Sequence, residues 1–245
     1  MANSNPFGEH ELFATEEHRI FRATLRRFVE EEMAPRAREF DQQGRFDKSL
    51  YLRMGEIGML GIRYDPAWGG GGLDWSFSAI FAEELQRCDN AGVAMGIVAH
   101  TDMATPALCN FGSDQLRRDY LVPAIKGEKV GAIAVTEPQA GSDVAGIKTR
   151  AVRDGDDWVI NGQKMFITNA ATADFLCLLA VTDAEAGYGG YTQIIVPTDV
   201  AGYSCTLLDK IGNHGSDTGA VYLEDIRVPV TNTIGDPGRG FQQQM

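Results

Sequence analysis

The chain changes character at the stretch Ile133-Ala134-Val135-Thr136-Glu137-Pro138-Gln139-Ala140-Gly141-Ser142-Asp143. Its apolar start predicts a strand, and the proline, glycine, hydroxyl and carboxylate groups that follow predict a loop. A loop of this kind suits a polar, partly anionic ligand that is held against the edge of a sheet. An ordinary polar turn has the same composition, so the residue types by themselves leave both interpretations open.

The residues before this stretch are typical of helices. Phe21, Leu25, Phe28 and Val29 recur at the spacing of one helix face, and the pattern weakens near Pro35. Further helices are expected over residues 49–59, 77–85 and 91–108. Another should begin after the N-cap Ser113 and stop at Gly127. The glycine-rich residues 64–72 between them predict a loop.

The residues after Val130 favour short strands, because β-branched and aromatic residues alternate there with turn dipeptides. Asp154-Gly155 and Asn161-Gly162 are both typical of tight hairpin turns. The expected strands are 130–135, 147–153, 158–160, 164–168, 175–181, 191–196, 203–208 and 220–228. Short strands without intervening helices predict an antiparallel sandwich or barrel.

The fold class is therefore α+β, with three parts along the chain. We expect an all-α N-terminal domain over residues 1–130 and an antiparallel β-barrel or sandwich over residues 131–237. Residues 238–245 would begin a further element. A length of 245 residues is compatible with two domains of ordinary size.

Composition narrows the function. Lys and Arg total 22 and Asp and Glu total 34, so the formal net charge is −12, which argues against nucleic-acid or membrane-surface partners. The four cysteines form no CxxC pair, so we expect reduced thiols and no metal site. The start, Met1 to Gly8, lacks the apolar run of a signal peptide, and no stretch is long and apolar enough to span a membrane. These features predict a soluble cytoplasmic protein.

Isolated titratable residues carry little catalytic signal. Glu137 is expected to shape its loop, and His100 lies in an apolar run where a core or surface role is more usual than catalysis. His10, His18 and His214 lack the partners that would suggest a catalytic triad.

Four segments together resemble the acyl-CoA dehydrogenase family. The string TEPQAGSD, residues 136–143, is similar to that family's TEPxAGSD signature, and NGQKMFITN, residues 161–169, resembles its NGxKxxITN hairpin. SDT at residues 216–218, followed by EDIRVP at residues 224–229, and the glycine loop after Tyr64 resemble two more family segments. The four occur in the family's order and cover nearly the whole chain, and the long-chain type is the nearest within the family.

The resemblance implies FAD as the cofactor. Val135 through its backbone and Thr136 through its hydroxyl would contact the pyrimidine end of the flavin. Phe166 would cover one face of the ring, and Thr168 would donate a hydrogen bond near flavin N5. The positions assigned to cofactor contact are Ile133, Val135, Thr136, Gly141, Ser142, Phe166, Ile167 and Thr168.

The implied substrate is a fatty acyl-CoA thioester, with Ser142 and Thr182 as the candidate contacts. Residues 91–108 suit the wall of an acyl pocket, but a plain helical core looks the same. The implied reaction is α,β-dehydrogenation to the trans-2-enoyl-CoA. In the family the base is a glutamate of a C-terminal helical domain, which we expect beyond Met245. The chain is then expected to lack that domain, to bind FAD poorly and to be inactive by itself.

The resemblance also implies partners and leaves alternatives. An electron-transfer flavoprotein would accept the electrons, and the full-length protein would be a homotetramer. An acyl-CoA oxidase or a flavin monooxygenase of the same fold is one alternative. A non-catalytic binding subunit or fragment is the other.

Overall fold

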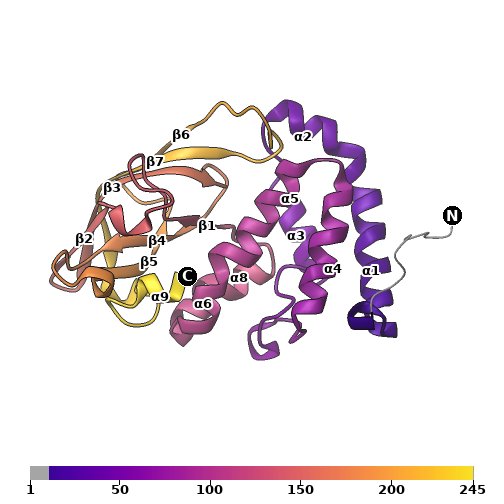
Figure 1. The fold of residues 1–245 in the computed structure, drawn as a ribbon, viewed down its shortest axis with the longest axis horizontal. Helices are drawn as coiled ribbons and strands as arrows, with labels where there is room; N and C mark the ends of the chain where they lie inside the picture. Colours follow the sequence, from indigo (N-terminus) through magenta and orange to yellow (C-terminus); the bar gives the residue numbers. More distant parts are fainter. Residues whose placement is uncertain (1–10, 245) are drawn as a thin grey trace.

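The computed structural model describes residues 11–244, in which a helical part adjoins a curled β-sheet (Figure 1). The η segments are short 3-10 or π-helical turns. The helical elements are η1 (Glu11–Phe13), α1 (Glu16–Phe28), η2 (Val29–Met33), η3 (Ala34–Arg36), α2 (Ala37–Gln43), α3 (Ser49–Glu56), η4 (Pro66–Trp68), α4 (Trp75–Leu85), η5 (Gln86–Cys88), α5 (Ala91–Val98), η6 (Ala99–Ala104), α6 (Thr105–Phe111), α7 (Asp114–Leu116), η7 (Arg117–Leu121), α8 (Val122–Ile125), η8 (Val144–Gly146), η9 (Gly187–Gly190), η10 (Val230–Asn232) and α9 (Gly240–Gln244).

Local signals placed most of these helices where the sequence predicts them. Thr15 caps α1, and Ser113 caps α7 by accepting from the Leu116 amide at 3.2 Å. Gly127 ends the run of helices in a left-handed conformation, with φ of 74°. Helical backbone continues past Pro35, where the apolar pattern of the sequence weakens. Since η2 and η3 continue it into α2, Pro35 lies at the start of a 3-10 turn, where its missing N–H removes no hydrogen bond.

The strands form a seven-stranded mixed sheet in the order β1-β4-β2-β3-β7-β6, and β5 pairs with β4. Their bounds are β1 (Gly131–Ala134), β2 (Arg150–Asp154), β3 (Asp157–Thr168), β4 (Phe175–Val181), β5 (Tyr191–Pro197), β6 (Tyr203–Leu207) and β7 (Thr218–Pro229). The α+β class is confirmed, with helices first and a curled sheet after them.

Two strand pairings depart from the expected antiparallel pattern. β1 and β2 both run parallel to β4, while the other pairings are antiparallel. The β2–β3 hairpin lies between β1 and β4 in the sequence. It therefore acts as the long crossover that a parallel pair requires. Strand periodicity carries no information about pairing direction, so the sequence could not reveal this.

The Asp154-Gly155 turn is confirmed, but a hairpin turn at Asn161-Gly162 is wrong. β3 runs unbroken through these residues and pairs with β7 on both sides of a register shift between Ile160 and Gly162. Asn161 bonds to Asp225 across the shift, through its amide group at 2.9 Å. A Cβ on Gly162 would lie 2.4 Å from Thr149 Oγ1, so the glycine is needed for close strand approach.

β4 is the strand that joins the helices to the sheet. Phe175 and Cys177 pack with Leu108 and Leu121 of the helical part, whereas Leu176 and its alternate neighbours face the sheet core. This alternation follows the period of two along a strand. All four cysteines are free thiols. None of the described helices is long and apolar enough to cross a membrane.

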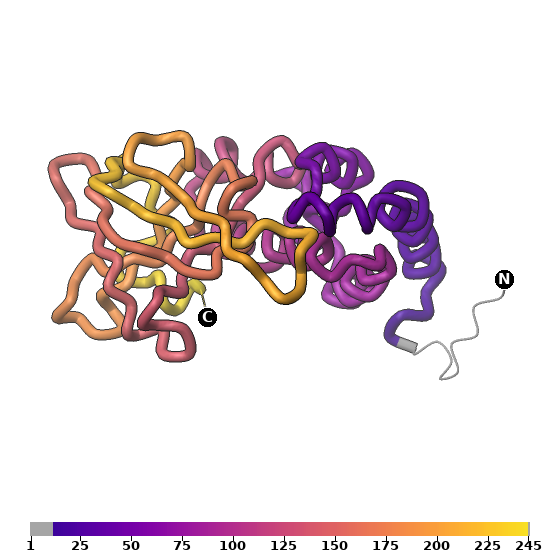
Figure 2. Tube along the Cα trace, turned by 90° about the horizontal axis from the view of Figure 1, so that it is seen from above, coloured from indigo at the N-terminus to yellow at the C-terminus, as the bar shows by residue number. Residues whose placement is uncertain are grey.

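The β6–β7 connection makes a second junction. Figure 2 shows it reaching from the sheet to the helical part. Gly92 of α5 packs there so closely that a Cβ would lie 2.6 Å from the Gly215 amide nitrogen. The two parts are therefore in contact both along β4 and at the β6–β7 connection.

Candidate functional site

The loop after β1 lies beside the second half of β3. Val135 and Thr136 follow the last residue of β1, and both are half-buried. The Thr136 carbonyl accepts from the Met165 amide at 2.8 Å, and the Val135 carbonyl accepts from Lys164 Nζ at 2.9 Å. Residues that are about 30 positions apart thus form one edge.

β3 carries a bulge at this edge. Lys164 pairs with Val221 and Ile167 with Gly219, so β3 has one residue more than its partner between these pairs. Phe166 lies in the bulge with φ of 61°, and 66% of it is exposed. A left-handed backbone is unfavourable for an aromatic residue, and an exposed aromatic ring is unusual at such a position. The bulge therefore turns a large apolar surface outward beside the β1 loop.

Hydroxyl groups without protein partners line the same edge. The side chains of Thr136, Ser142 and Thr168 make no hydrogen bond to any residue in the described range 11–244. Thr168 pairs with Thr218 through the backbone alone. These hydroxyls are free to donate to or accept from a bound molecule.

Gly141 is exposed at this edge. Its φ is not positive, and a Cβ there would meet nothing closer than Thr136 Cγ2 at 3.9 Å. Neither backbone strain nor protein packing therefore requires a glycine at this position. Open space beside free hydroxyls and an outward aromatic ring fits a flat, polar cofactor such as FAD.

The edge rests on a buried ion pair. Lys164 Nζ lies 2.9 Å from Glu137 Oε1, and the two side chains are 0% and 3% exposed. Burial alone would raise the pKa of Glu137, but the Lys164 charge and the N–H donors outweigh burial and lower this pKa to about 2. Burial lowers the pKa of Lys164 to about 8, against the opposing effect of Glu137. Both groups are therefore charged at neutral pH, and Glu137 shapes the loop as predicted.

Three of the sequence-predicted positions have side chains directed elsewhere. Ile133 packs against the cluster between the helices and β4, and Ile167 is buried in the sheet core. The Thr182 hydroxyl lies 2.7 Å from that of Thr192 and bonds to the Gly190 carbonyl at 3.2 Å. The edge thus gathers Val135, Thr136, Gly141, Ser142, Phe166 and Thr168.

The sequence assigned no role to Asn169, but the Asn169 side chain fixes the end of β3. Asn169 is buried and left-handed, with φ of 66°, and its Nδ2 donates to the Gly96 carbonyl at 2.9 Å. Tyr51 donates to the same carbonyl at 3.0 Å. Thr168 is therefore held at a fixed position relative to α5. Asparagine directly after a strand was the available signal, because it tolerates the left-handed region.

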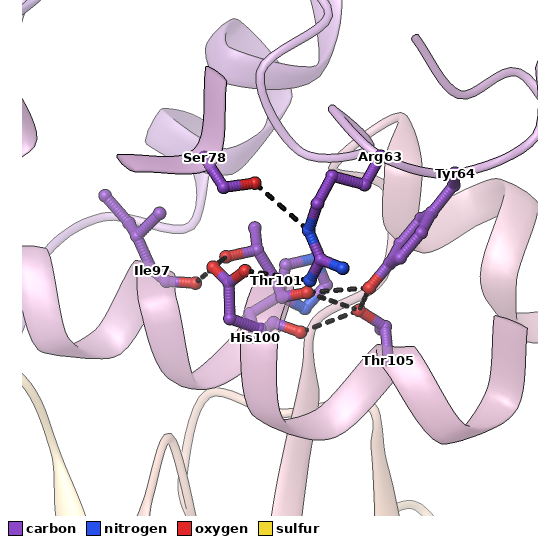
Figure 3. A network of polar contacts seen from close by, with 8 residues as sticks. Arg63, Tyr64, Ser78, Ile97, His100, Thr101 and Thr105 are labelled. Atoms are coloured by element: carbon purple, nitrogen blue, oxygen red, sulfur yellow. Dashed lines mark hydrogen bonds and ion pairs between the residues drawn. The ribbon is translucent and has the colours of Figure 1, made fainter. Parts of the chain in front are cut away.

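A second polar network, shown in Figure 3, fastens the residue 60–72 loop to η6. Arg63 donates to Ser78 Oγ at 3.0 Å and lies 3.4 Å from Asp102. The buried Tyr64 hydroxyl donates to the Thr101 carbonyl at 2.6 Å. These contacts fix residues 99–105, which the sequence offered as either pocket wall or core.

The described histidines contribute no catalytic arrangement. His100 is fully buried between the Ala124 carbonyl and the Gly131 amide, and burial lowers its pKa to about 4. His18 bonds to Thr15 and Ser76, and His214 is exposed. His10 lies outside the described residues. Within residues 11–244, no three His, Cys, Asp or Glu side chains cluster as metal ligands.

The helical part and the sheet both match domains of one enzyme family. Residues 15–128 match the acyl-CoA dehydrogenase N-terminal domain, and residues 132–226 match the acyl-CoA dehydrogenase middle domain. The chain belongs to the acyl-CoA dehydrogenase family.

Individual relatives of this chain are named as members of the same family. The short-chain specific acyl-CoA dehydrogenase of Clostridium acetobutylicum is 39% identical over 229 residues, covering 93% of this chain and 60% of the relative. The mitochondrial long-chain specific enzyme of Sus scrofa is 35% identical over 243 residues, covering 97% and 55%. Because both types match at similar identity, the long-chain assignment stays a prediction.

Solved structures show the same fold. An acyl-CoA dehydrogenase from Geobacillus kaustophilus superimposes with a TM-score of 0.90 at 36% identity, covering 94% of this chain and 61% of that one. A glutaryl-CoA dehydrogenase from Mycobacterium smegmatis, solved in complex with FADH2, gives 0.87 at 26% identity, covering 96% and 60%. The chain thus spans 55% to 61% of the length of these four proteins.

Proposed function

We propose that this chain supplies the flavin-binding edge of an FAD-dependent acyl-CoA dehydrogenase, which converts a fatty acyl-CoA to the trans-2-enoyl-CoA. The observation that carries the proposal is the bulge in β3. It holds Phe166 outward in a left-handed conformation beside the unpartnered hydroxyls of Thr136 and Thr168. Backbone strain of this kind clusters at binding and catalytic sites.

The residues of the edge would divide the work of holding FAD. The Phe166 ring covers one face of the flavin and excludes water. The Thr136 and Thr168 hydroxyls donate to polar atoms of the ring, where negative charge gathers on reduction. Gly141 leaves room for the ligand, and Ser142 binds its phosphate-bearing part. FAD, when bound, supplies the acceptor for the hydride that leaves the β carbon.

Ser142 and Thr182 are the proposed substrate contacts. Ser142 is exposed and free to bind the CoA part of the thioester. Thr182 could do so once its hydroxyl turns from Thr192. The carboxylate of Glu137 accepts from Lys164, Gln139 and the amides of residues 148 and 149, so it is not available as the base. A glutamate in the additional length that the relatives possess is our candidate.

The test uses the purified protein at its full natural length. FAD binding is measured by quenching of flavin fluorescence, and acyl-CoA of several lengths is then added without oxygen. Bleaching of the flavin absorbance supports the proposal, and a protein that binds no FAD refutes it. Thr136→Ala should weaken FAD binding, whereas Thr182→Ala should leave it unchanged.

The electron acceptor requires a second measurement. We propose an electron-transfer flavoprotein as acceptor and a homotetramer as the assembly of the intact protein. Stopped-flow reoxidation by oxygen separates this reading from an oxidase or a monooxygenase. Slow reoxidation in air supports a dehydrogenase, and fast reoxidation favours the alternatives.

A further inference from the structure

A fully buried lysine lies directly behind the proposed flavin edge. The Lys164 side chain is 0% exposed, which is rare for lysine unless partners satisfy its charge. Its Nζ donates to the Val135 carbonyl and to Glu137 Oε1, both at 2.9 Å. The ammonium group thus connects a carboxylate to the backbone of a residue that we place against the cofactor.

The position of this ammonium group is fixed from the other side. Glu137 Oε2 accepts from the Lys148 amide at 2.7 Å, and Glu137 Oε1 accepts from the Thr149 amide at 2.9 Å. The carboxylate is therefore anchored to backbone rather than to mobile side chains. The Met165 amide holds the Thr136 carbonyl at 2.8 Å. The Val135 and Thr136 carbonyls, on either side of the Thr136 nitrogen and α carbon, are therefore both hydrogen-bonded to β3.

The peptide between Val135 and Thr136 transmits the effect of the lysine. It is trans, like every peptide bond among the described residues, so its N–H points opposite to its carbonyl. Lys164 draws the Val135 carbonyl toward the buried pair, and the Thr136 N–H is thereby directed away from it. A charged donor on the carbonyl also polarises the peptide and makes its N–H a stronger donor.

We propose that Lys164 is a positioning residue for the flavin. Through the Val135 carbonyl, it fixes and polarises the peptide N–H of Thr136, and so favours reduced, negatively charged flavin over oxidised flavin. The inference rests on the proposed function, because it requires FAD at this edge. It adds a role to a residue for which the sequence suggested none.

The experiment compares three variants of the intact, flavin-loaded protein with the wild type. Lys164→Met removes the charge at similar length but leaves Glu137 buried without its partner. Lys164→Met combined with Glu137→Gln removes both charges, which avoids an unpaired buried charge and should preserve the fold. Glu84→Gln is the matched control, because Glu84 is also 0% exposed and held by Arg22 and Arg26, but in the helical part.

The decisive readout is the midpoint potential of the bound flavin. We expect both Lys164 variants to lower it by about 30 mV or more, which is a tenfold weaker preference for the reduced form in a two-electron couple. In the flavin-free protein, the Met165 amide, which donates to the Thr136 carbonyl, should exchange with solvent at least about tenfold faster in the double variant, since the loop then loses its Lys164 contact. The Glu84 control should lower the unfolding midpoint and leave the potential unchanged.

The outcomes separate this inference from the proposed function. A wild-type potential in both Lys164 variants, with stability alone reduced, overturns the positioning role while FAD binding stands. Loss of FAD binding by a double variant that unfolds like the wild type supports the role. If the wild type itself binds no FAD, both the proposed function and this inference fall.

Discussion

We predict that acid destabilises the folded protein by protonating the carboxylate of Glu137. Its pKa is about 2 in the folded protein, well below the ordinary value of 4.5 for a glutamate side chain. A carboxylate with a lowered folded pKa contributes stability that is fully present above about pH 4.5 and is lost as the pH falls toward 2. In that window the unfolded chain binds a proton more readily than the folded protein does. The Lys164 charge persists throughout it, since the pKa of Lys164 is about 8.

The magnitude of this effect follows from the difference between the two pKa values of Glu137, which is about 2.5. At 1.36 kcal/mol per unit, the whole contribution is about 3 kcal/mol. By pH 3 the linkage relation gives a loss of about 2 kcal/mol. Solvent screens this pair only weakly, because the Glu137 side chain is 3% exposed. A loss of this size is a substantial fraction of the stability of an ordinary domain.

Urea unfolding of the wild type and of Glu137→Gln, at pH 6 and at pH 3, measures this term. The glutamine cannot titrate, so the stability gap between the two proteins should narrow by about 2 kcal/mol at pH 3. Glu31→Gln serves as the control, because Glu31 is exposed on η2 and forms no ion pair with another described residue. A gap of equal size at both pH values would show that the pair does not set the acid sensitivity.

Three further predictions concern single side chains. Phe166→Gly should raise the free energy of unfolding by about 1 kcal/mol, because glycine relieves the left-handed strain. The same change should weaken FAD binding, whereas Phe166→Leu should keep the strain. Urea unfolding measures the effect on stability, and flavin titration measures the effect on FAD binding. Glu84→Ala should lower stability by about 3 kcal/mol, since it leaves Arg22 and Arg26 without their shared buried partner, and a thermal melt that matches the wild type would contradict this. Thr168→Ala should slow flavin reduction by substrate more than it weakens FAD binding, as seen by stopped-flow absorbance, and equal reduction rates in variant and wild type would defeat it.

Short-range features of this fold were readable from the sequence. The Ser113 cap, the Gly127 stop and the Asp154-Gly155 turn each depend on residues within a few positions of one another, and each is present. The two-part division also follows from local composition. The Asn161-Gly162 error has the same origin, because that dipeptide suits a turn locally. The hydrogen bond from Asn161 to Asp225, 64 positions away, instead stabilises a continuous strand.

The sequence by itself therefore determined the order of helices and strands and the motifs that mark the family. Periodicity, caps and strings of neighbouring residues encode these directly. The tertiary structure alone decided that β1 runs parallel to β4, that Phe166 turns outward in a bulge, and that Lys164 meets Glu137 across 27 positions. Each of these depends on partners that are brought close by the folded sheet. A buried charge or a strained backbone is stable only where the surrounding packing supplies its compensation.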